Sequence, residues 1–197
     1  MRLCIPLLLL GAIIAAPGAA LGHSAAGASE SPDDADLRSA RDFAARIGAL
    51  TALQQSVVRA QSAGVASSDP KKLAANQTDI AAGLVAARRG ANQGDIFTPD
   101  AALRFRRLIH KAFHEGQGRA MRQTIREDDH VRPVVLRVNE VYPESIPTTT
   151  MPPTLLRALP VLPASLGYRI VGSALVLVDV RSNLIVDFMP DAIPADR

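Results

Sequence analysis

The spacing of apolar residues changes about two thirds of the way along the chain, from a helical repeat to a strand-like alternation. Up to about residue 128, apolar positions recur every three or four residues, with Ser, Thr or Pro where helices would begin. This repeat predicts helices over residues 33–63, 70–89, 98–115 and 119–128. Later apolar and β-branched residues alternate and predict strands over residues 134–142, 168–171, 174–180 and 184–188. The fold class expected is α+β, with three to four helices followed by a small antiparallel β-meander.

The first residues carry the pattern of an export signal. Arg2 precedes the apolar run Leu3–Ala16, and small residues follow. A short positive start, an apolar stretch and a small-residue exit are typical of a secretory signal peptide. Cleavage is expected before His23, with cuts after Ala20 or near residues 26–28 as alternatives. The protein would then be periplasmic or secreted.

An uncleaved membrane anchor is the alternative explanation for this run. A membrane-spanning helix needs about 18 or more apolar residues. The run here is shorter and contains Pro6 and Gly11. We therefore expect cleavage, with no transmembrane segment left afterwards.

Changes in composition divide the chain into five predicted parts. Between the meander and the helices, residues 143–163 contain six prolines, which favour an extended chain around a short turn at residues 154–159. The expected parts are a signal peptide (1–22), a disordered leader (23–32), a helical region (33–130), a proline-rich segment with the β-meander (131–190) and a tail (191–197).

Cysteine content and net charge limit the reactions and the partners that we expect of this chain. Cys4 is the only cysteine and would leave with the signal, so thiol catalysis and disulfides are not expected in the mature chain. The net charge is only +3, whereas a nucleic-acid binder usually carries a strong basic patch. We expect no nucleic-acid partner.

His110 and His114 are the strongest metal-ligand candidates. Their spacing of four places both on one face of the predicted helix, and Glu115 follows directly. The same face carries Arg106, Arg107 and Lys111, whose charges oppose cation binding. A solvated basic face is the simpler interpretation, and a divalent transition metal at these residues stays the alternative to having no cofactor.

Positive charge is concentrated on the third predicted helix. Arg104, Arg106, Arg107 and Lys111 could meet a phosphate, a lipopolysaccharide or an acidic partner, because attraction at long range needs only charge density. A charged helix surface that faces solvent and binds no partner is the alternative explanation for these residues.

Asp179 and Asp187 lie within apolar strands, where an unpaired carboxylate is costly. They would form an acid–base dyad only if the hairpin register made them face each other. Exposure at a sheet edge, or pairing with Arg169 or Arg181, is the simpler expectation.

The C-terminal stretch Leu162–Met189 resembles the ending of several small exported bacterial proteins. The shared pattern is a proline-rich lead into a double hairpin, here YRIVG, LVLVD and IVD. Some of those proteins are uncharacterised, and others are periplasmic proteins linked to nickel and cobalt efflux. The resemblance implies export and a hairpin fold, and it assigns no catalytic residue.

The function expected is that of an exported, non-enzymatic protein that binds a protein or envelope partner. The proline-rich segment and an open sheet edge are the expected docking surfaces. A periplasmic metal-binding or metal-sensing protein using His110 and His114 is the first alternative, and a hydrolase is the second.

Overall fold

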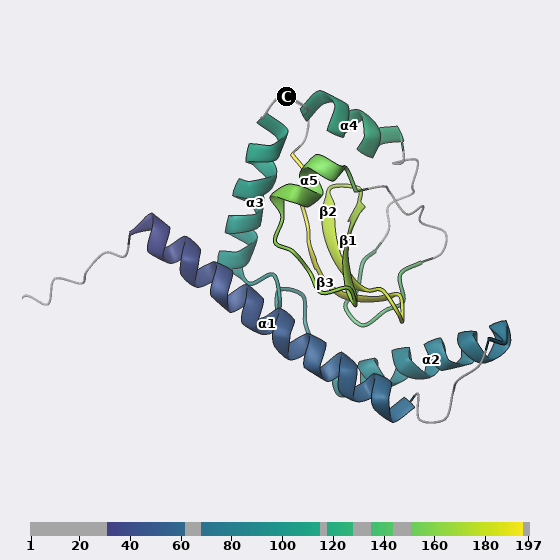
Figure 1. The fold of residues 1–197 in the computed structure, drawn as a ribbon. Helices are drawn as coiled ribbons and strands as arrows, with labels where there is room; N and C mark the ends of the chain where they lie inside the picture. Colours follow the sequence, from purple (N-terminus) through teal and green to yellow (C-terminus); the bar gives the residue numbers. More distant parts are fainter. Residues whose placement is uncertain (1–30, 62–67, 115–117, 128–134, 144–150, 195–197) are drawn as a thin grey trace, which may run out of the picture. The chain divides into compact units, whose positions relative to one another are not determined.

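Helices precede strands along the chain, as the sequence predicts (Figure 1). The computed structural model describes residues 31–61, 68–114, 118–127, 135–143 and 151–194, all within the unit Ser31–Arg197. The helices are α1 (Pro32–Gln61), α2 (Pro70–Ala87), α3 (Pro99–His114), α4 (Gly118–Glu127) and the short α5 (Pro153–Ala158). The strands are β1 (Leu166–Val171), β2 (Ala174–Asp179) and β3 (Leu184–Met189). The predicted α+β class, with a three-stranded meander after the helices, is confirmed.

Capping side chains fix where three of the helices begin. The Ser31 hydroxyl accepts a hydrogen bond from the Asp34 N–H at 3.2 Å, and Thr98 accepts one from Ala101 at 3.4 Å. Asp69 accepts one from the Lys71 N–H at 2.9 Å. Each cap satisfies a backbone donor that has no partner within its helix, and proline follows each cap directly.

The sheet is an antiparallel meander in the order β1-β2-β3. Gly172, at φ +56°, permits the tight turn that pairs Val171 with Ala174. Between β2 and β3 the register shifts, because Leu177 pairs with Asp187 while Val178 pairs with Ile185. The β3 strand therefore carries an extra residue, which is a β-bulge.

β2 is buried along its whole length because both faces of the sheet are covered. One face packs against α1, α3, α4 and α5. Aromatic rings form the centre of this layer, with the Phe105 centroid 4.9 Å from Phe43, 5.1 Å from Phe97 and 6.0 Å from Tyr168. The other face packs against Tyr142 and Leu136.

The strand expected over residues 134–142 is wrong for the described part, residues 135–142. Asn139 has φ +65°, and the chain turns there instead of continuing as a strand. The segment still reaches β3: Asn139 donates to the Ile185 carbonyl at 2.9 Å, and Tyr142 donates to the Asn183 carbonyl at 2.7 Å. It therefore covers part of the β3 edge of the meander.

The helix ends differ from the prediction by a few residues. α2 ends at Ala87 rather than residue 89, and α4 runs one residue earlier than predicted. Residues 62–63, Glu115 and residue 128 lie outside the described residues. None of the helices in the described ranges is both long enough and apolar enough to cross a membrane.

Candidate functional site

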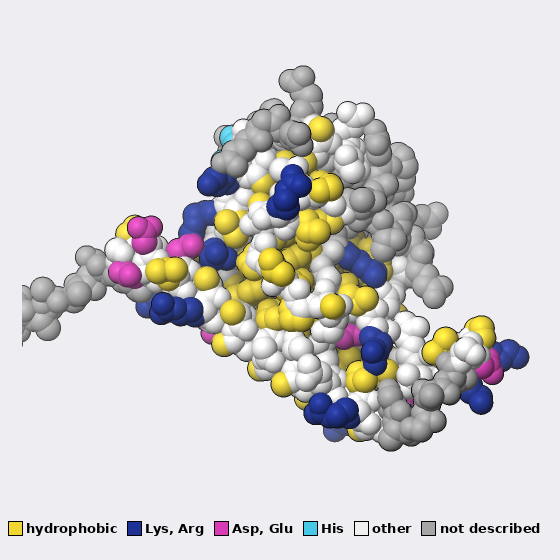
Figure 2. Space-filling view, viewed as in Figure 1, with side chains coloured by type: hydrophobic (Ala, Val, Ile, Leu, Met, Phe, Trp, Pro, Cys, Tyr) yellow, Lys and Arg dark blue, Asp and Glu magenta, His cyan; other side chains and the backbone are white. Residues whose placement is uncertain are grey.

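An apolar groove runs beside α1, between that helix, α3 and the segment that links α5 to β1. Figure 2 shows it as a band of apolar side chains with Lys and Arg on its flanks. Its volume is about 560 Å³. The lining residues are Ala40, Phe43, Ala44, Ile47 and Gly48 of α1, Arg104 and Leu108 of α3, and Ala158, Leu159, Pro160, Val161 and Pro163.

The residue types explain why this groove stays open. Ala40, Ala44 and Gly48 have little or no side chain, and a Cβ added at Gly48 would meet nothing within 4 Å. On the opposite wall Val161 is 96% exposed. The groove is thus an exposed apolar surface, of the kind that commonly marks an interaction site.

A cationic pocket of about 650 Å³ adjoins one end of the groove. Arg104 and Leu108 line both spaces, and the pocket adds Asp36, Arg107 and Lys111. Asp36 joins the two arginines: one carboxylate oxygen accepts from Arg104 Nε at 3.1 Å, and the other accepts from Arg107. The hydrogen bond from Arg107, followed by that from Arg104, holds the pKa of the Asp36 carboxyl below its usual range, although partial burial opposes this.

The four cations predicted as one anion or partner site therefore fall into two groups. Arg104, Arg107 and Lys111 line the pocket. Arg106 instead donates to the Pro190 carbonyl at 3.1 Å, near the end of β3. Helical spacing alone could not separate them, because the division depends on where α1 and the C-terminal segment lie.

His110 and His114 lie together on the exposed face of α3. Their rings stack with centroids 3.9 Å apart, and His114 Nδ1 lies 2.8 Å from the His110 carbonyl oxygen. Glu115, the third expected ligand, is outside the described residues. Among the described residues there is no group of three or more His, Cys, Asp or Glu side chains that could hold a metal ion. The metal site stays a prediction.

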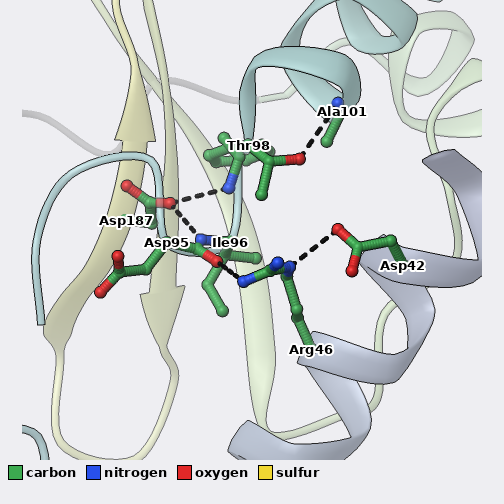
Figure 3. A network of polar contacts seen from close by, with 8 residues as sticks. Asp42, Arg46, Asp95, Ile96, Thr98, Ala101 and Asp187 are labelled. Atoms are coloured by element: carbon green, nitrogen blue, oxygen red, sulfur yellow. Dashed lines mark hydrogen bonds and ion pairs between the residues drawn. The ribbon is translucent and has the colours of Figure 1, made fainter. Parts of the chain in front are cut away.

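Asp187 is fully buried and holds the loop before α3 against the sheet (Figure 3). Its Oδ2 accepts from the Ile96 and Phe97 N–H groups, both at 2.8 Å, while Oδ1 accepts from Gly94 at 2.9 Å and Phe188 at 2.8 Å. The β-bulge matters here, because Asp187 pairs with Leu177, whose side chain lies in the helix-facing core. Four N–H donors compensate the cost of burying the carboxylate.

Arg88 supports the same region from the end of α2. It is 9% exposed and donates to the Val186 carbonyl at 2.7 Å and to Asn139 Oδ1 at 2.9 Å. Burial lowers the pKa of its guanidinium, while the charge of Asp187 opposes that shift. Arg88 thereby joins the end of α2 to the 139 turn and to β3.

Asp179 is also buried, and two side chains and one backbone N–H hold it. Gln54 of α1 donates to its Oδ2, and the Ser182 N–H and hydroxyl both donate to Oδ1 at 2.6 Å. Ser165 in turn donates to Gln54 Oε1 at 2.9 Å. A second groove of about 580 Å³ lies over this chain of contacts, but the polar groups in its floor already bond one another.

The expected surroundings of the two aspartates are therefore wrong. Both are buried rather than exposed at an edge, and neither is held by Arg169 or Arg181 through a contact among the described residues. The alternative of an acid–base dyad is also wrong, because the two aspartates are not partners in the hairpin register: Asp179 pairs with Leu184, and Asp187 pairs with Leu177. The role of Gln54 could not be predicted from the sequence, because its partner Asp179 lies 125 residues further along the chain.

The chemistry available in the apolar groove is that of binding. Among the described residues that line the groove, Arg104 is the one charged residue, and the others are apolar residues or glycine. Comparison of the chain with protein-family models, with curated proteins and with solved structures finds no match in any of the three.

Proposed function

We propose that this chain is an exported, non-enzymatic binding protein that holds an apolar segment of a protein or envelope partner in the groove beside α1. One observation carries the proposal: an open groove of about 560 Å³ is lined almost entirely by apolar side chains. Burying that surface against a partner would contribute about 25 cal/mol per Å² of apolar area before the costs of association.

The polar residues support binding over catalysis. The buried carboxylates of Asp179 and Asp187 accept hydrogen bonds from within the fold, and the hydroxyls of Ser165 and Ser182 donate within the contacts around Asp179. A nucleophile or general base must instead face bound substrate. In the groove, the lining residues that the structure describes offer a guanidinium but no carboxylate, hydroxyl or imidazole. This favours the binding proposal over the hydrolase alternative.

Export rests on the sequence pattern at Met1–Ala16 and on the resemblance of the C-terminal hairpins to exported proteins. Fractionation of producing cells, followed by mass measurement of the purified chain, tests it. We expect a mature chain that begins at His23 or at one of the alternative cuts. Recovery of uncleaved protein in the membrane fraction would contradict it.

Photo-crosslinking from two positions tests the groove itself. A photoreactive phenylalanine analogue replaces Val161 in the groove wall or, as the control, Val135, which is 73% exposed and outside the groove. In producing cells we expect a discrete crosslinked species from position 161 and not from position 135. Equal crosslinking from both positions, or none from either, would contradict the proposal.

Metal binding is the second candidate, and the stacked imidazole rings of His110 and His114 favour it. Titration with zinc, nickel and copper, with His110→Ala as the control, tests this function. Metal affinity no tighter than about millimolar, or metal affinity unchanged in the variant, would rule out metal binding at these two histidines.

A further inference from the structure

We infer that the segment held in the groove is an amphipathic helix with acidic side chains at one end. The inference rests on the proposed function and adds the chemistry of the partner. Its basis is that the apolar groove and the cationic pocket are continuous, since Arg104 and Leu108 line both. A partner segment lying in the groove therefore reaches the cations at its end.

The charges around this end favour an acidic partner. Arg104, Arg107 and Lys111 line the pocket together with two acids, Asp33 and Asp36. Asp36 bonds to both arginines through a single nitrogen of each, and every guanidinium has five N–H donors. The two arginines are thus held side by side in a geometry suited to partner carboxylates.

The shape of the groove favours a helix over a hydrocarbon chain. Ala40, Ala44 and Gly48 recur every four residues, so the α1 wall is low over about 12 Å, or roughly two helical turns. The groove is open to solvent, as the 96% exposure of Val161 shows. A hydrocarbon chain lying there would keep part of its apolar surface in water. An amphipathic helix instead buries its apolar face and presents its polar face to solvent.

A displayed peptide library identifies the preferred chemistry without knowledge of the natural partner. The library consists of 18-residue amphipathic helices, about five turns each, with varied apolar faces and with Glu, Lys, Gln and Ser equally represented at polar positions. Binders are selected on the immobilised full-length protein. Each is then measured against Gly48→Phe, which fills the groove, and against Ala49→Phe, which adds the same ring to an exposed position of α1 outside the groove.

We expect binders that lose affinity for Gly48→Phe, keep it for Ala49→Phe and carry Glu clustered at one end. Neutralising two exposed cations in Arg107→Gln/Lys111→Gln should weaken these binders by about threefold to thirtyfold, and more at low salt. Arg106→Gln, which removes a cation of α3 outside the pocket, should leave them within about twofold.

Three results would overturn the inference, and they separate it from the proposed function. If the peptides that bind in the groove are neutral or basic, the partner is not an acidic helix, but the groove is still a binding site. Groove-dependent binding of dodecanoate that is tighter than that of any selected peptide would assign the groove to a lipid chain instead. Absence of any binder sensitive to Gly48→Phe would contradict both proposals.

Discussion

The Asp187 region and the groove beside α1 leave their side chains in opposite situations. Around Asp187, a buried carboxylate accepts four backbone hydrogen bonds, and Arg88 closes the region from α2. Along the groove, the Val161 side chain stays open to solvent, and Gly48 leaves space that a side chain could fill. The first region uses its interactions within the fold, whereas the second keeps apolar surface for a partner. Substitutions should therefore alter stability in the first and binding in the second.

Removing the Asp187 carboxylate should have the largest effect on stability. In Asp187→Ala the buried N–H groups of Ile96 and Phe97 and the part-buried N–H of Gly94 lose their acceptor, so the free energy of unfolding should fall by about 3 kcal/mol or more. Urea unfolding followed by circular dichroism measures it. Asp42→Ala, which breaks only the surface pair with Arg46, should cost less than about 1 kcal/mol. Equal losses in the two variants would contradict the role of Asp187.

Alkaline pH should unfold the protein through its buried tyrosines. Burial raises the pKa of both Tyr142 and Tyr168 above the ordinary value of about 10. Because the folded-state pKa is raised, this contribution to stability is full below about pH 10 and is lost as the pH rises through the folded-state pKa.

The measurement is simple because the chain has two tyrosines and no tryptophan. We expect the tyrosinate absorbance to rise only together with the loss of circular dichroism. Ionisation of either tyrosine near pH 10 in the folded protein would show that its ring is accessible to solvent.

Two helical glycines should respond oppositely to alanine, beginning with Gly83 of α2. A Cβ there would lie 2.7 Å from Val57 Cγ1 of α1, so the packed α1–α2 contact must shift. Overpacking costs about 1–3 kcal/mol, and the better helix propensity of alanine offsets about 0.5–1 kcal/mol. We expect Gly83→Ala to lower the free energy of unfolding by about 1 kcal/mol.

Gly48→Ala should give the smallest change, with the opposite sign. Its added Cβ meets nothing within 4 Å, so the gain in helix propensity should raise the free energy of unfolding by about 0.5–1 kcal/mol. Thermal unfolding of both glycine variants in the same buffer makes the comparison. Destabilisation by Gly48→Ala would show that the groove is more tightly packed than the structure indicates.

The local parts of the fold could be predicted because they depend on neighbours in sequence. Helical spacing predicted α1 and α3, and capping residue types predicted where they start. Leu37, Phe43 and Ile47 all belong to the helical repeat of apolar residues in α1, yet only Phe43 and Ile47 are buried, whereas Leu37 is 55% exposed and lines the cationic pocket. Periodicity identifies the apolar face of a helix, but it does not show which part of that face other elements cover.

The candidate site could not be predicted because its parts come together only in three dimensions. Arg104 and Arg107 were identified by charge, but their partner Asp36 lies about 70 residues earlier, on α1. The groove needs α1, α3 and residues 158–163 at once. The bonding of Asp187 likewise depends on a bulge in β3 and on a loop some 90 residues earlier in the chain.

The most direct test of the groove as a binding site combines binding and stability in one pair of variants. The photoreactive residue at position 161 is combined with Gly48→Phe or with Ala49→Phe, and crosslink yield and unfolding free energy are measured for each. We expect Gly48→Phe to abolish the crosslink while its unfolding free energy stays within about 1 kcal/mol of the Ala49→Phe protein. A full crosslink yield in the stably folded Gly48→Phe protein would contradict the role of the groove as a binding site.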